Sequence, residues 1–387
     1  MAHSEEGLDS QAAVRRTNLR RALQLVFRHP GEETRAGIAR ATGLTAATAS
    51  SLVAELIESR LVVEGGQARS TGGKRATTLS IDAGHHLLFA MVLRPVDALA
   101  ALVSLDGTTV YEERIAYSAT TRDRAVREML TRIADRFGGR MLLASVQLTG
   151  ATDGRTVLES VQLDMSNVPL AEQYEAILGV RVALINDVDA EAIAEVVTEE
   201  QHEGLRLFVH LGTGVGGAVT LDGDIAPGPS TRAGEIGHVQ VVFGPKAQLC
   251  RCGRYGCVEA SASLTAILGP EYDESLDDAE VAPLLAAVDP ETLRLGADAL
   301  ARVIKLVGAM LDPSEVIIGG PAVILGDDFL EAVREALAYD ARGTNPLAVR
   351  YASTNVPAFA GAAQFALSTA LGVRWSPAQL TLTPERA

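Results

Sequence analysis

The chain has 387 residues, of which 49 are acidic and 34 basic, and its formal net charge is −15. Hydrophobic residues make up 47% and charged residues 21%, so the chain can bury a sizeable core and is not intrinsically disordered. The net charge excludes a protein that coats nucleic acid or anionic membrane with its whole surface. Residues 10–80 differ from the rest, because they carry eleven basic and five acidic side chains, a local charge of 11 − 5 = +6.

The first ten residues contain acidic side chains and no apolar segment, so we expect no secretory signal. No uninterrupted apolar run approaches the ~18 residues of a membrane-spanning helix. We therefore expect a soluble, cytoplasmic protein with no membrane partner.

The N-terminal region is predicted to be a small helical domain. Residues 14–28 carry apolar side chains at helical spacing. Two further helices follow, capped by Thr34 and Thr45 and separated by the turn residue Gly43. Two short β-like runs then flank a basic, glycine-rich tip. This order predicts a winged helix-turn-helix DNA-binding domain over residues 10–80.

The helix after the turn of a helix-turn-helix places its first residues against base edges in the major groove. Short hydroxyl side chains there can bond to bases or phosphates, and basic side chains at the wing can reach phosphates or a minor groove. The predicted DNA-binding residues are Thr45, Ala46, Thr48, Ser50, Ser51, Lys74 and Arg75. Operator DNA is the expected partner, and an ordinary small bundle with solvated arginines is the alternative.

Residues 81–375 alternate between strand-like and helix-like segments, which is typical of an α/β domain with helices flanking its sheets. Strands are expected over residues 87–93, 98–104, 141–147, 180–185, 207–211, 218–221 and 315–318. Helices are expected over residues 118–137, 170–178, 188–198 and 292–311. The acidic stretch 271–280 is interpreted as a solvated connection between helices.

All three cysteines lie within eight residues of one another, at Cys250, Cys252 and Cys257, and His238 precedes them. Three thiolates and one imidazole are the ligands that a tetrahedral structural Zn²⁺ prefers. Four protein ligands leave no open position for a catalytic water, so the predicted zinc is structural. The alternative is three buried thiols beside a lone histidine.

Polar side chains that suit sugar recognition surround these ligands. Glu235 and Glu259 flank the metal motif, and Asn186-Asp187 follows an apolar run. Convergent carboxylates and an amide can form paired hydrogen bonds with sugar hydroxyls. For Asn186-Asp187 taken alone, a helix cap is the alternative interpretation.

With these motifs in order, the chain resembles the ROK family (repressors, open reading frames and kinases of sugars) in its repressor branch. The resemblance spans residues 14–371. Its landmarks are Arg40-Ala-Thr-Gly-Leu-Thr45, Gly73-Lys-Arg75, Thr149-Gly150, Asn186-Asp187, Gly212-Thr-Gly-Val-Gly-Gly217, Glu235-x-Gly-His238, Cys250-x-Cys-Gly-x-x-Gly-Cys257-x-Glu259 and Gly319-Gly320.

The resemblance implies an α/β fold, namely a two-lobed actin/hexokinase-like (ribonuclease H-like) domain over residues 81–375 that binds sugar, oligomerises and contains the zinc. It implies that His238 binds both sugar and zinc and that Asp187 occupies the base position of the kinases. The implied sugar-binding residues are Asn186, Asp187, Glu235, His238 and Glu259.

Two departures from the kinase pattern argue against a working ATP site. The family's phosphate-binding segment reads Asp-x-Gly-Gly-Thr, whereas this chain has Asp82-Ala-Gly84-His85-His86. Gly319-Gly320 is followed by Pro321, which stiffens that turn. We therefore expect no catalysis and interpret Asp187 as a vestigial base. Gln162 and Asp189 also differ from the family's usual residues and bear on which ligand is bound.

The sequence thus predicts a sugar-responsive DNA-binding transcriptional regulator, a repressor of carbohydrate uptake or metabolism genes. Its expected effector is a sugar or sugar phosphate, and it is expected to form a homodimer or homotetramer that binds two half-sites. The alternatives are a ROK-type sugar kinase with an appended DNA-binding domain and a ligand-blind oligomeric regulator.

Overall fold

The computed structural model describes residues 2–67, 76–198, 204–226, 228, 233–274, 276–338, 347–353, 356–376 and 379, so the predicted DNA contacts Lys74 and Arg75 lie outside the described residues. The chain forms two compact units. Unit 1 consists of Met1–Ile185, Val197–Glu200 and Pro357–Ala387, and unit 2 of Asn186–Val196 and Gln201–Val356. The predicted boundary after residue 80 falls inside unit 1 and stays a prediction.

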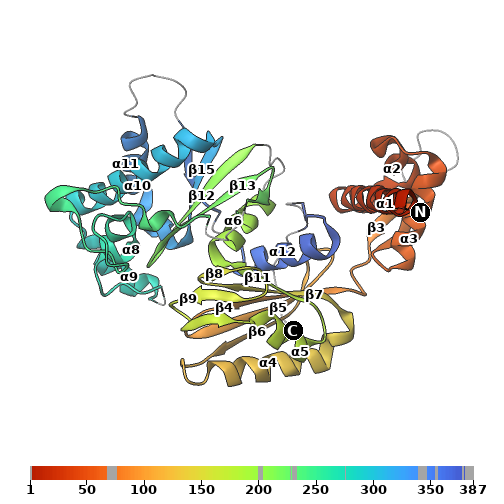
Figure 1. Ribbon diagram of the computed structural model, residues 1–387, viewed down its shortest axis with the longest axis horizontal. Coiled ribbons are helices and arrows are strands. Elements are labelled where there is room, and N and C mark those ends of the chain that lie inside the picture. The colour runs from red at the N-terminus through yellow and green to blue at the C-terminus, as the bar shows by residue number, and fades with distance from the viewer. Residues whose placement is uncertain are drawn as a thin grey trace. The chain divides into compact units, whose positions relative to one another are not determined.

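The N-terminal part of unit 1, residues 2–81, is called the head here and has the order of a winged helix-turn-helix (Figure 1). Its elements are α1 (Ala2–Arg28), β1 (Glu33–Thr34), α2 (Arg35–Thr42), α3 (Ala46–Glu58), β2 (Val62–Gln67) and β3 (Thr77–Ile81). The Thr34 hydroxyl accepts a hydrogen bond from the backbone of Gly37, and the Thr45 hydroxyl accepts one from Thr48. Both predicted caps are therefore confirmed. Gly43 has φ +70°, which allows the turn between α2 and α3.

Helix α1 begins earlier than the expected start at residue 14. Residues 2–13 contain no proline and include several good helix formers, so the helix can extend through them. They lack the apolar repeat that marks residues 14–28, which is why no pattern predicted this extension. The three helices and the sheet enclose a core formed by Leu23, Val26, Phe27, Ile38, Leu52, Val53, Leu56 and Leu79.

The head is bound to the C-terminal segment of unit 1. The Gln24 side-chain amide donates to the Arg374 carbonyl at 2.9 Å and accepts from the Arg374 N–H at 2.8 Å. The neighbouring Trp375 donates from its ring nitrogen to the Leu105 carbonyl at 2.8 Å. Residues 374–375 therefore join α1 to the rest of unit 1.

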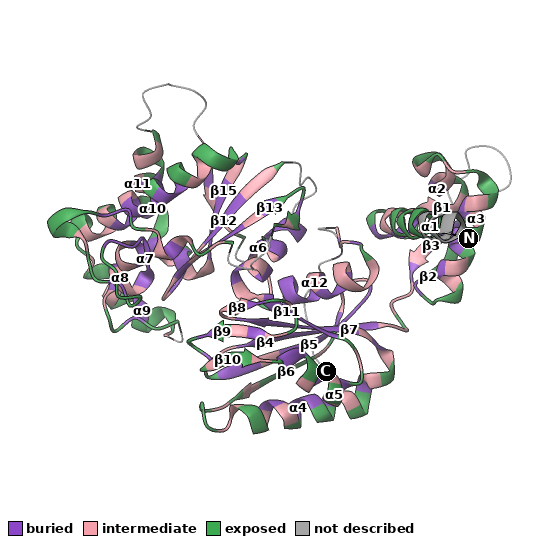
Figure 2. Cartoon of the chain, in the orientation of Figure 1, coloured by how far each residue is buried: buried purple, intermediate pink, exposed green. Residues whose placement is uncertain are grey.

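The remainder of unit 1 is a mixed sheet with helices on both faces. In spatial order its strands are β11 (Val182–Asn186), β7 (Met141–Leu148), β4 (Leu87–Leu93), β5 (Asp97–Ser104) and β6 (Thr109–Ala116). Figure 2 shows the central strands buried, and every residue of β4 is buried. Alternate residues of β4 pack with α4 (Arg122–Phe137) and α5 (Leu170–Leu178) on one face and with α12 (Ala360–Leu371) on the other.

Unit 2 is built around a second mixed sheet. In spatial order its strands are β14 (Asp224–Ile225), β13 (Val215–Leu221), β12 (Leu205–Leu211), β15 (Glu315–Gly319) and β16 (Ala348–Tyr351). One face packs with α7 (Glu259–Ala262), α8 (Leu264–Leu268), α10 (Pro290–Leu311) and α11 (Gly326–Ala338). The other face carries Phe208, Ala218 and Ile317 against α6 (Asp187–Val197). The turn between β12 and β13 thereby lies close to several helix ends.

The remaining elements are short. They are β8 (Ala151–Thr152), β9 (Val157–Ser160), β10 (Met165–Val168), α9 (Asp278–Ala286) and the 3₁₀ turns η1 (Gly138–Arg140), η2 (Ile236–His238), η3 (Gly244–Lys246) and η4 (Gly320–Leu325). Every strand and helix expected over residues 81–375 is present, β4 and α5 with the expected bounds and the others with shifted ends. Among the described helices, none is long and apolar enough to cross a membrane.

Candidate functional site

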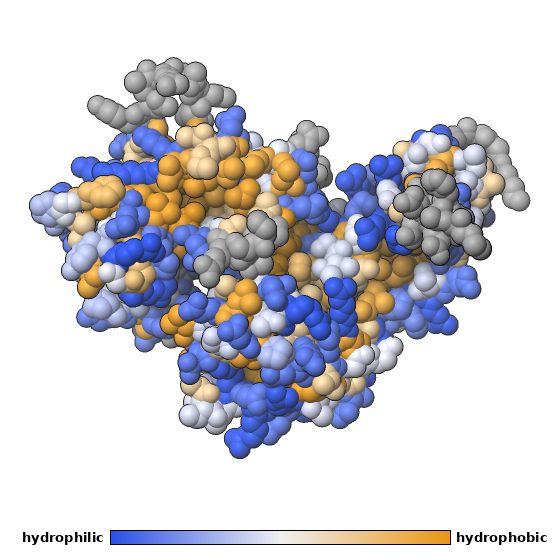
Figure 3. Space-filling model, in the orientation of Figure 1, coloured by the Kyte–Doolittle hydropathy of each residue, from blue (hydrophilic) through white to orange (hydrophobic). Residues whose placement is uncertain are grey.

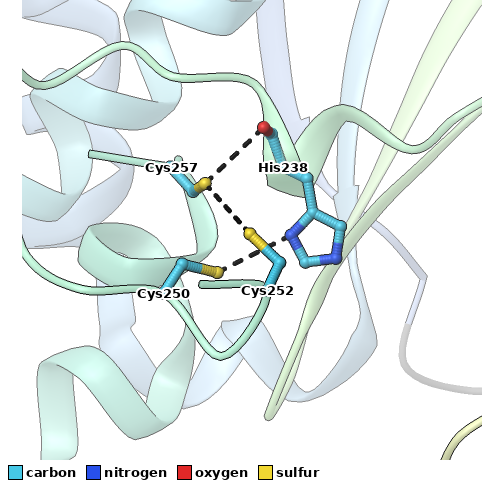
Figure 4. A group of neighbouring side chains, drawn as sticks. All are labelled: His238, Cys250, Cys252 and Cys257. Carbon is cyan, nitrogen blue, oxygen red and sulfur yellow. Dashed lines mark hydrogen bonds between the residues drawn. The ribbon is translucent and has the colours of Figure 1, made fainter. Parts of the chain in front are cut away.

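His238 and the three cysteines form one cluster in unit 2 (Figure 4). Their possible ligand atoms all lie within 4.8 Å of one another. The Cys250 Sγ lies 3.7 Å from the His238 Nδ1, and the Cys252 Sγ lies 3.6 Å from the Cys257 Sγ. A tetrahedral zinc ion with Zn–S bonds of about 2.3 Å separates its sulfur ligands by about 3.8 Å. The cluster therefore has the donors and the spacing to hold a tetrahedral metal ion.

A tight turn brings the cysteines together. The Gly253 N–H donates to the Cys250 carbonyl at 2.9 Å, and the Cys250 N–H donates to the Arg254 carbonyl at 2.8 Å. Gly256 has φ +78°, and a Cβ there would lie 1.8 Å from the Val242 carbonyl oxygen. Glycine is therefore required at position 256 for the chain to turn before Cys257.

The three thiols of this cluster differ in their pKa values. Burial raises the pKa of Cys257 to about 12 and raises the pKa of Cys250 as well. A hydrogen bond with Arg254 lowers the pKa of the exposed Cys252 to about 6. The two buried thiols thus keep their protons at neutral pH unless a metal ion stabilises the thiolates.

Glu259 connects the metal cluster to the glycine-rich turn at residues 212–217. The residue is 6% exposed, and its carboxylate pairs with Arg251, whose Nε lies 2.8 Å from Oε1. Its other oxygen accepts the Val215 N–H at 3.3 Å. The Cys250 Sγ lies 3.6 Å from Oε1, so the carboxylate is fixed beside the metal cluster.

Asn186 and Asp187 lie where β11 ends and α6 begins. The Asn186 Oδ1 accepts the N–H groups of Val188 at 2.8 Å and Asp189 at 3.2 Å, so the helix-cap interpretation is confirmed. Burial raises the pKa of Asp187 to about 7, and the nearby His210 opposes this shift. A carboxyl group with this pKa can accept a proton near neutral pH.

His210, on β12, was missed by the sequence analysis because no motif marks it. Its Nδ1 lies 2.7 Å from the Glu191 Oε2. Burial lowers the pKa of His210, but the carboxylates of Glu191, Asp187 and Glu274 outweigh burial and raise it to about 9. The imidazole is therefore protonated at neutral pH and compensates the charge of the acidic side chains around it.

The turn at residues 212–217 joins the segments that carry the predicted sugar-binding residues. A Cβ on Gly216 would lie 2.9 Å from the Val188 side chain in α6, and a Cβ on Gly217 would lie 2.9 Å from the Ile236 side chain. A Cβ on Gly214 would lie 2.9 Å from Arg251. The structure thus packs the segments that carry the predicted sugar-binding residues against one turn. The predicted sugar-binding residues are Asn186, Asp187, Glu235, His238 and Glu259. Glu235 itself is exposed.

Glu274 contacts the same turn. Its Oε1 accepts the Thr213 backbone N–H at 2.7 Å and the Thr213 hydroxyl at 3.1 Å. Residues 271–280 lead from α8 into the first turn of α9, and most of their described side chains are exposed, as expected for a solvated connection between helices. The stretch also brings the Glu274 carboxylate to a turn 61 residues away in the sequence.

The degenerate motif at residues 82–86 forms a turn with defined partners in unit 1. The Gly84 N–H donates to the Asp82 Oδ1 at 3.1 Å. Arg140 donates to the carbonyls of Gly84 at 2.9 Å and His85 at 3.1 Å. The His86 Nε2 lies 3.0 Å from the Ser59 carbonyl at the end of α3. This turn therefore links the head to the sheet of unit 1.

The predicted DNA-binding residues of α3 lie near its first turn. Thr45, Ala46 and Ser51 are exposed, whereas Thr48 and Ser50 are half-buried. Arg15 of α1 pairs with the Glu55 carboxylate at 2.5 Å and lies 3.5 Å from the Ser51 hydroxyl. Arg15 is a cation beside the candidate contacts that the sequence analysis did not single out, because its helix is distant from α3 in the sequence.

Known proteins similar to this chain include regulators and kinases. The chain is 25% identical over 370 residues to the DNA-binding transcriptional dual regulator NagC of Escherichia coli, covering 89% of this chain and 88% of that protein. It is 29% identical over 272 residues to an N-acetylmannosamine kinase of Shigella boydii, covering 68% of this chain and 89% of the kinase.

Among solved structures, a ROK family transcriptional regulator described as a homologue of the Escherichia coli MLC protein superposes with a TM-score of 0.73 at 21% identity, covering 95% of this chain and 98% of that one. This likeness confirms the predicted fold class, an actin/hexokinase-like α/β body preceded by a winged-helix head. The sequence model of the ROK family matches residues 96–368. The chain belongs to the ROK family.

Proposed function

We propose that this protein is a sugar-responsive DNA-binding transcriptional regulator, a repressor of carbohydrate uptake or metabolism genes. The observation that carries the proposal is the winged-helix head, which presents the first turn of α3 to solvent. Residues 81–387 make up 307/387, or 79%, of the chain, so a similarity to the regulator NagC that covers 89% includes part of the head. The similarity to the kinase covers 68% of the chain and does not have to include the head.

In this proposal the start of α3 enters the major groove and the wing contacts phosphates or a minor groove. The contacts come from Thr45, Ala46, Thr48, Ser50, Ser51, Lys74 and Arg75. Short side chains give little affinity per half-site, so a homodimer or homotetramer binds two of them. Figure 3 shows apolar residues gathered on the surface of unit 2, and Leu306, Met310 and Val323 are among its exposed apolar side chains. Such surfaces support self-association.

The ligand part of the proposal rests on unit 2. Zn²⁺ held by His238, Cys250, Cys252 and Cys257 cross-links the loop that carries Glu259. A sugar or sugar phosphate then binds Asn186, Asp187, Glu235, His238 and Glu259. Because the His238 Nδ1 faces Cys250, its Nε2 is the atom left for a sugar hydroxyl. The effector alters operator affinity by binding two conformations of the protein unequally.

The DNA arm is tested with Ala46→Glu, after genome-wide mapping of bound DNA has identified the operator. Glutamate in the first turn stabilises a helix, so the variant keeps α3 folded while it repels phosphates. We expect operator affinity to fall about tenfold or more. Ala54→Glu, an exposed position near the other end of α3, is the matched control. Equal affinities for the two variants would show that the first turn of α3 does not contact DNA.

A sugar kinase is the competing function, because Asp187 retains a pKa suited to a base. A coupled assay of ATP turnover across hexoses distinguishes the two. We expect no turnover above background. Turnover that Asp187→Asn abolishes would establish a kinase, and calorimetry without heat from any sugar or sugar phosphate would establish a ligand-blind regulator.

A further inference from the structure

We propose that Glu274 is an internal substitute for a phosphate group and keeps the turn at residues 212–217 closed to nucleotide phosphates. Glycine-rich turns bind phosphate through backbone N–H groups that point at the anion. This turn retains four glycines and a threonine hydroxyl, which are the features of such a cradle. This turn differs from a phosphate-binding turn in that a carboxylate of the same chain already accepts hydrogen bonds from its donors.

The donors of Gly212, Thr213 and Val215, near the tip of the turn, have partners within unit 2. Thr213 gives both its N–H and its hydroxyl to one oxygen of Glu274. The Val215 N–H is directed to Glu259 at 3.3 Å, and the Gly212 N–H to the Gly214 carbonyl at 3.0 Å. A phosphate oxygen at Thr213 would therefore have to displace Glu274 and would meet its negative charge.

The surroundings hold Glu274 in this position. A Cβ built on Gly212 would lie 2.3 Å from the Glu274 Oε1 and 2.7 Å from the His210 Nε2, so the carboxylate and the imidazole approach the turn at the same point. His210 is cationic there and is attracted to the carboxylate. A Cβ on Gly320 would lie 2.7 Å from the same imidazole, so the late glycine pair encloses His210 as well.

This inference rests on the proposed function in one respect, because a regulator without catalysis has no need of a nucleotide. The inference adds that the contact between Glu274 and Thr213 excludes nucleotide from unit 2. The exclusion is therefore not merely the result of a lost motif. Removal of one side chain should therefore restore anion binding at the turn without any change to the turn itself.

The test compares the full-length protein with Glu274→Ala, titrated with inorganic triphosphate in calorimetry. We expect Glu274→Ala to bind triphosphate at least about tenfold more tightly than the unaltered protein, since charged hydrogen bonds become available. Glu271→Ala removes an exposed glutamate from the same stretch and is the matched control. In the double variant Glu274→Ala/Thr213→Val, the gain in triphosphate affinity should be smaller, because the hydroxyl donor of Thr213 is lost.

Amide hydrogen exchange gives a second readout that does not depend on ligand affinity. Exchange at Thr213 should be faster in Glu274→Ala, and triphosphate should restore protection. Equal triphosphate affinity in the unaltered protein and Glu274→Ala, or unchanged exchange at Thr213, would overturn the inference. Neither result depends on operator binding or on ATP turnover in the unaltered protein, so failure here is distinguishable from failure of the proposed function.

Discussion

The turn at residues 82–86 in unit 1 and the turn at residues 212–217 in unit 2 use their backbones differently. The first has one glycine and two histidines, and its carbonyl oxygens and His86 are bonded to Arg140 and to the head. The second keeps its glycines, and the N–H groups of Thr213 and Val215 are bonded to carboxylates of unit 2. The comparison teaches that two turns can differ in their glycines or in the partners of their backbone N–H groups. Only the difference in glycines is visible in a motif.

The largest expected effect comes from the metal cluster that supports the second turn. Replacing the fully buried Cys257 with serine removes a ligand and should destabilise unit 2 by more than about 4 kcal/mol, with loss of the bound metal. Metal content and denaturant unfolding measure this. Ala247→Ser, in the same loop, is the control. Amide exchange at residues 82–86 should not change, and an equally large change there would show that the two turns are not independent.

The next prediction compares Gly234, a glycine that packs against the second turn, with Gly84 of the first turn. Gly234 has φ +96°, and a Cβ there would lie 1.8 Å from the Gly217 carbonyl oxygen. Gly234→Ala should therefore destabilise unit 2 by about 3 kcal/mol. At Gly84 a Cβ would lie 3.5 Å from the nearest atom, Asp82 Oδ1, so Gly84→Ala should cost less than about 1 kcal/mol. Similar unfolding free energies for the two variants would contradict the comparison.

A smaller effect concerns pH. The pKa of His210 is raised from its ordinary 6.5 to about 9, so its stabilising contribution is complete below pH 6.5 and is lost as the pH rises through 9. Asp187, with its pKa raised to about 7, changes stability in the same direction at lower pH. We expect unfolding free energy to fall by about 2 kcal/mol between pH 6.5 and 9. The dependence of the unfolding free energy on pH should be weaker in His210→Asn. An unchanged dependence in that variant would show that other titratable groups cause it.

The smallest predicted effect concerns the first turn. His86→Ala removes the contact with the Ser59 carbonyl and should reduce the stability of the junction between the head and the sheet by about 1 kcal/mol. Hydrogen exchange in the last turn of α3 measures this. His85→Ala is the control, because its ring contacts His86 edge-on and has no part in the bond to Ser59. Equal effects of the two variants would show that ring packing, and not the hydrogen bond, stabilises the junction.

Local chemistry explains which features were predictable from the sequence. The caps at Thr34 and Thr45 depend on residues close in the sequence and were predicted correctly. His238 and the three cysteines converge as expected, whereas the zinc ion stays a prediction. The strand β6 was missed because it alternates between exposed and half-buried residues and contains several charged side chains. The contact of Glu274 with Thr213 could not be predicted, because nothing local distinguishes that glutamate from its acidic neighbours. His210 was missed for the same reason, since its partners come from other elements of unit 2.

The bond between Gln24 and Arg374 has a consequence for synthesis of the protein. The partners are 350 residues apart, and a ribosome that adds about 5–20 residues per second needs roughly 20–70 s to make the second after the first. The helices of the head can pack together during this interval, since their core lies within residues 2–81. Their attachment through residue 374 must wait until that residue has been synthesised. A nascent chain therefore displays a folded head before that head has its final support.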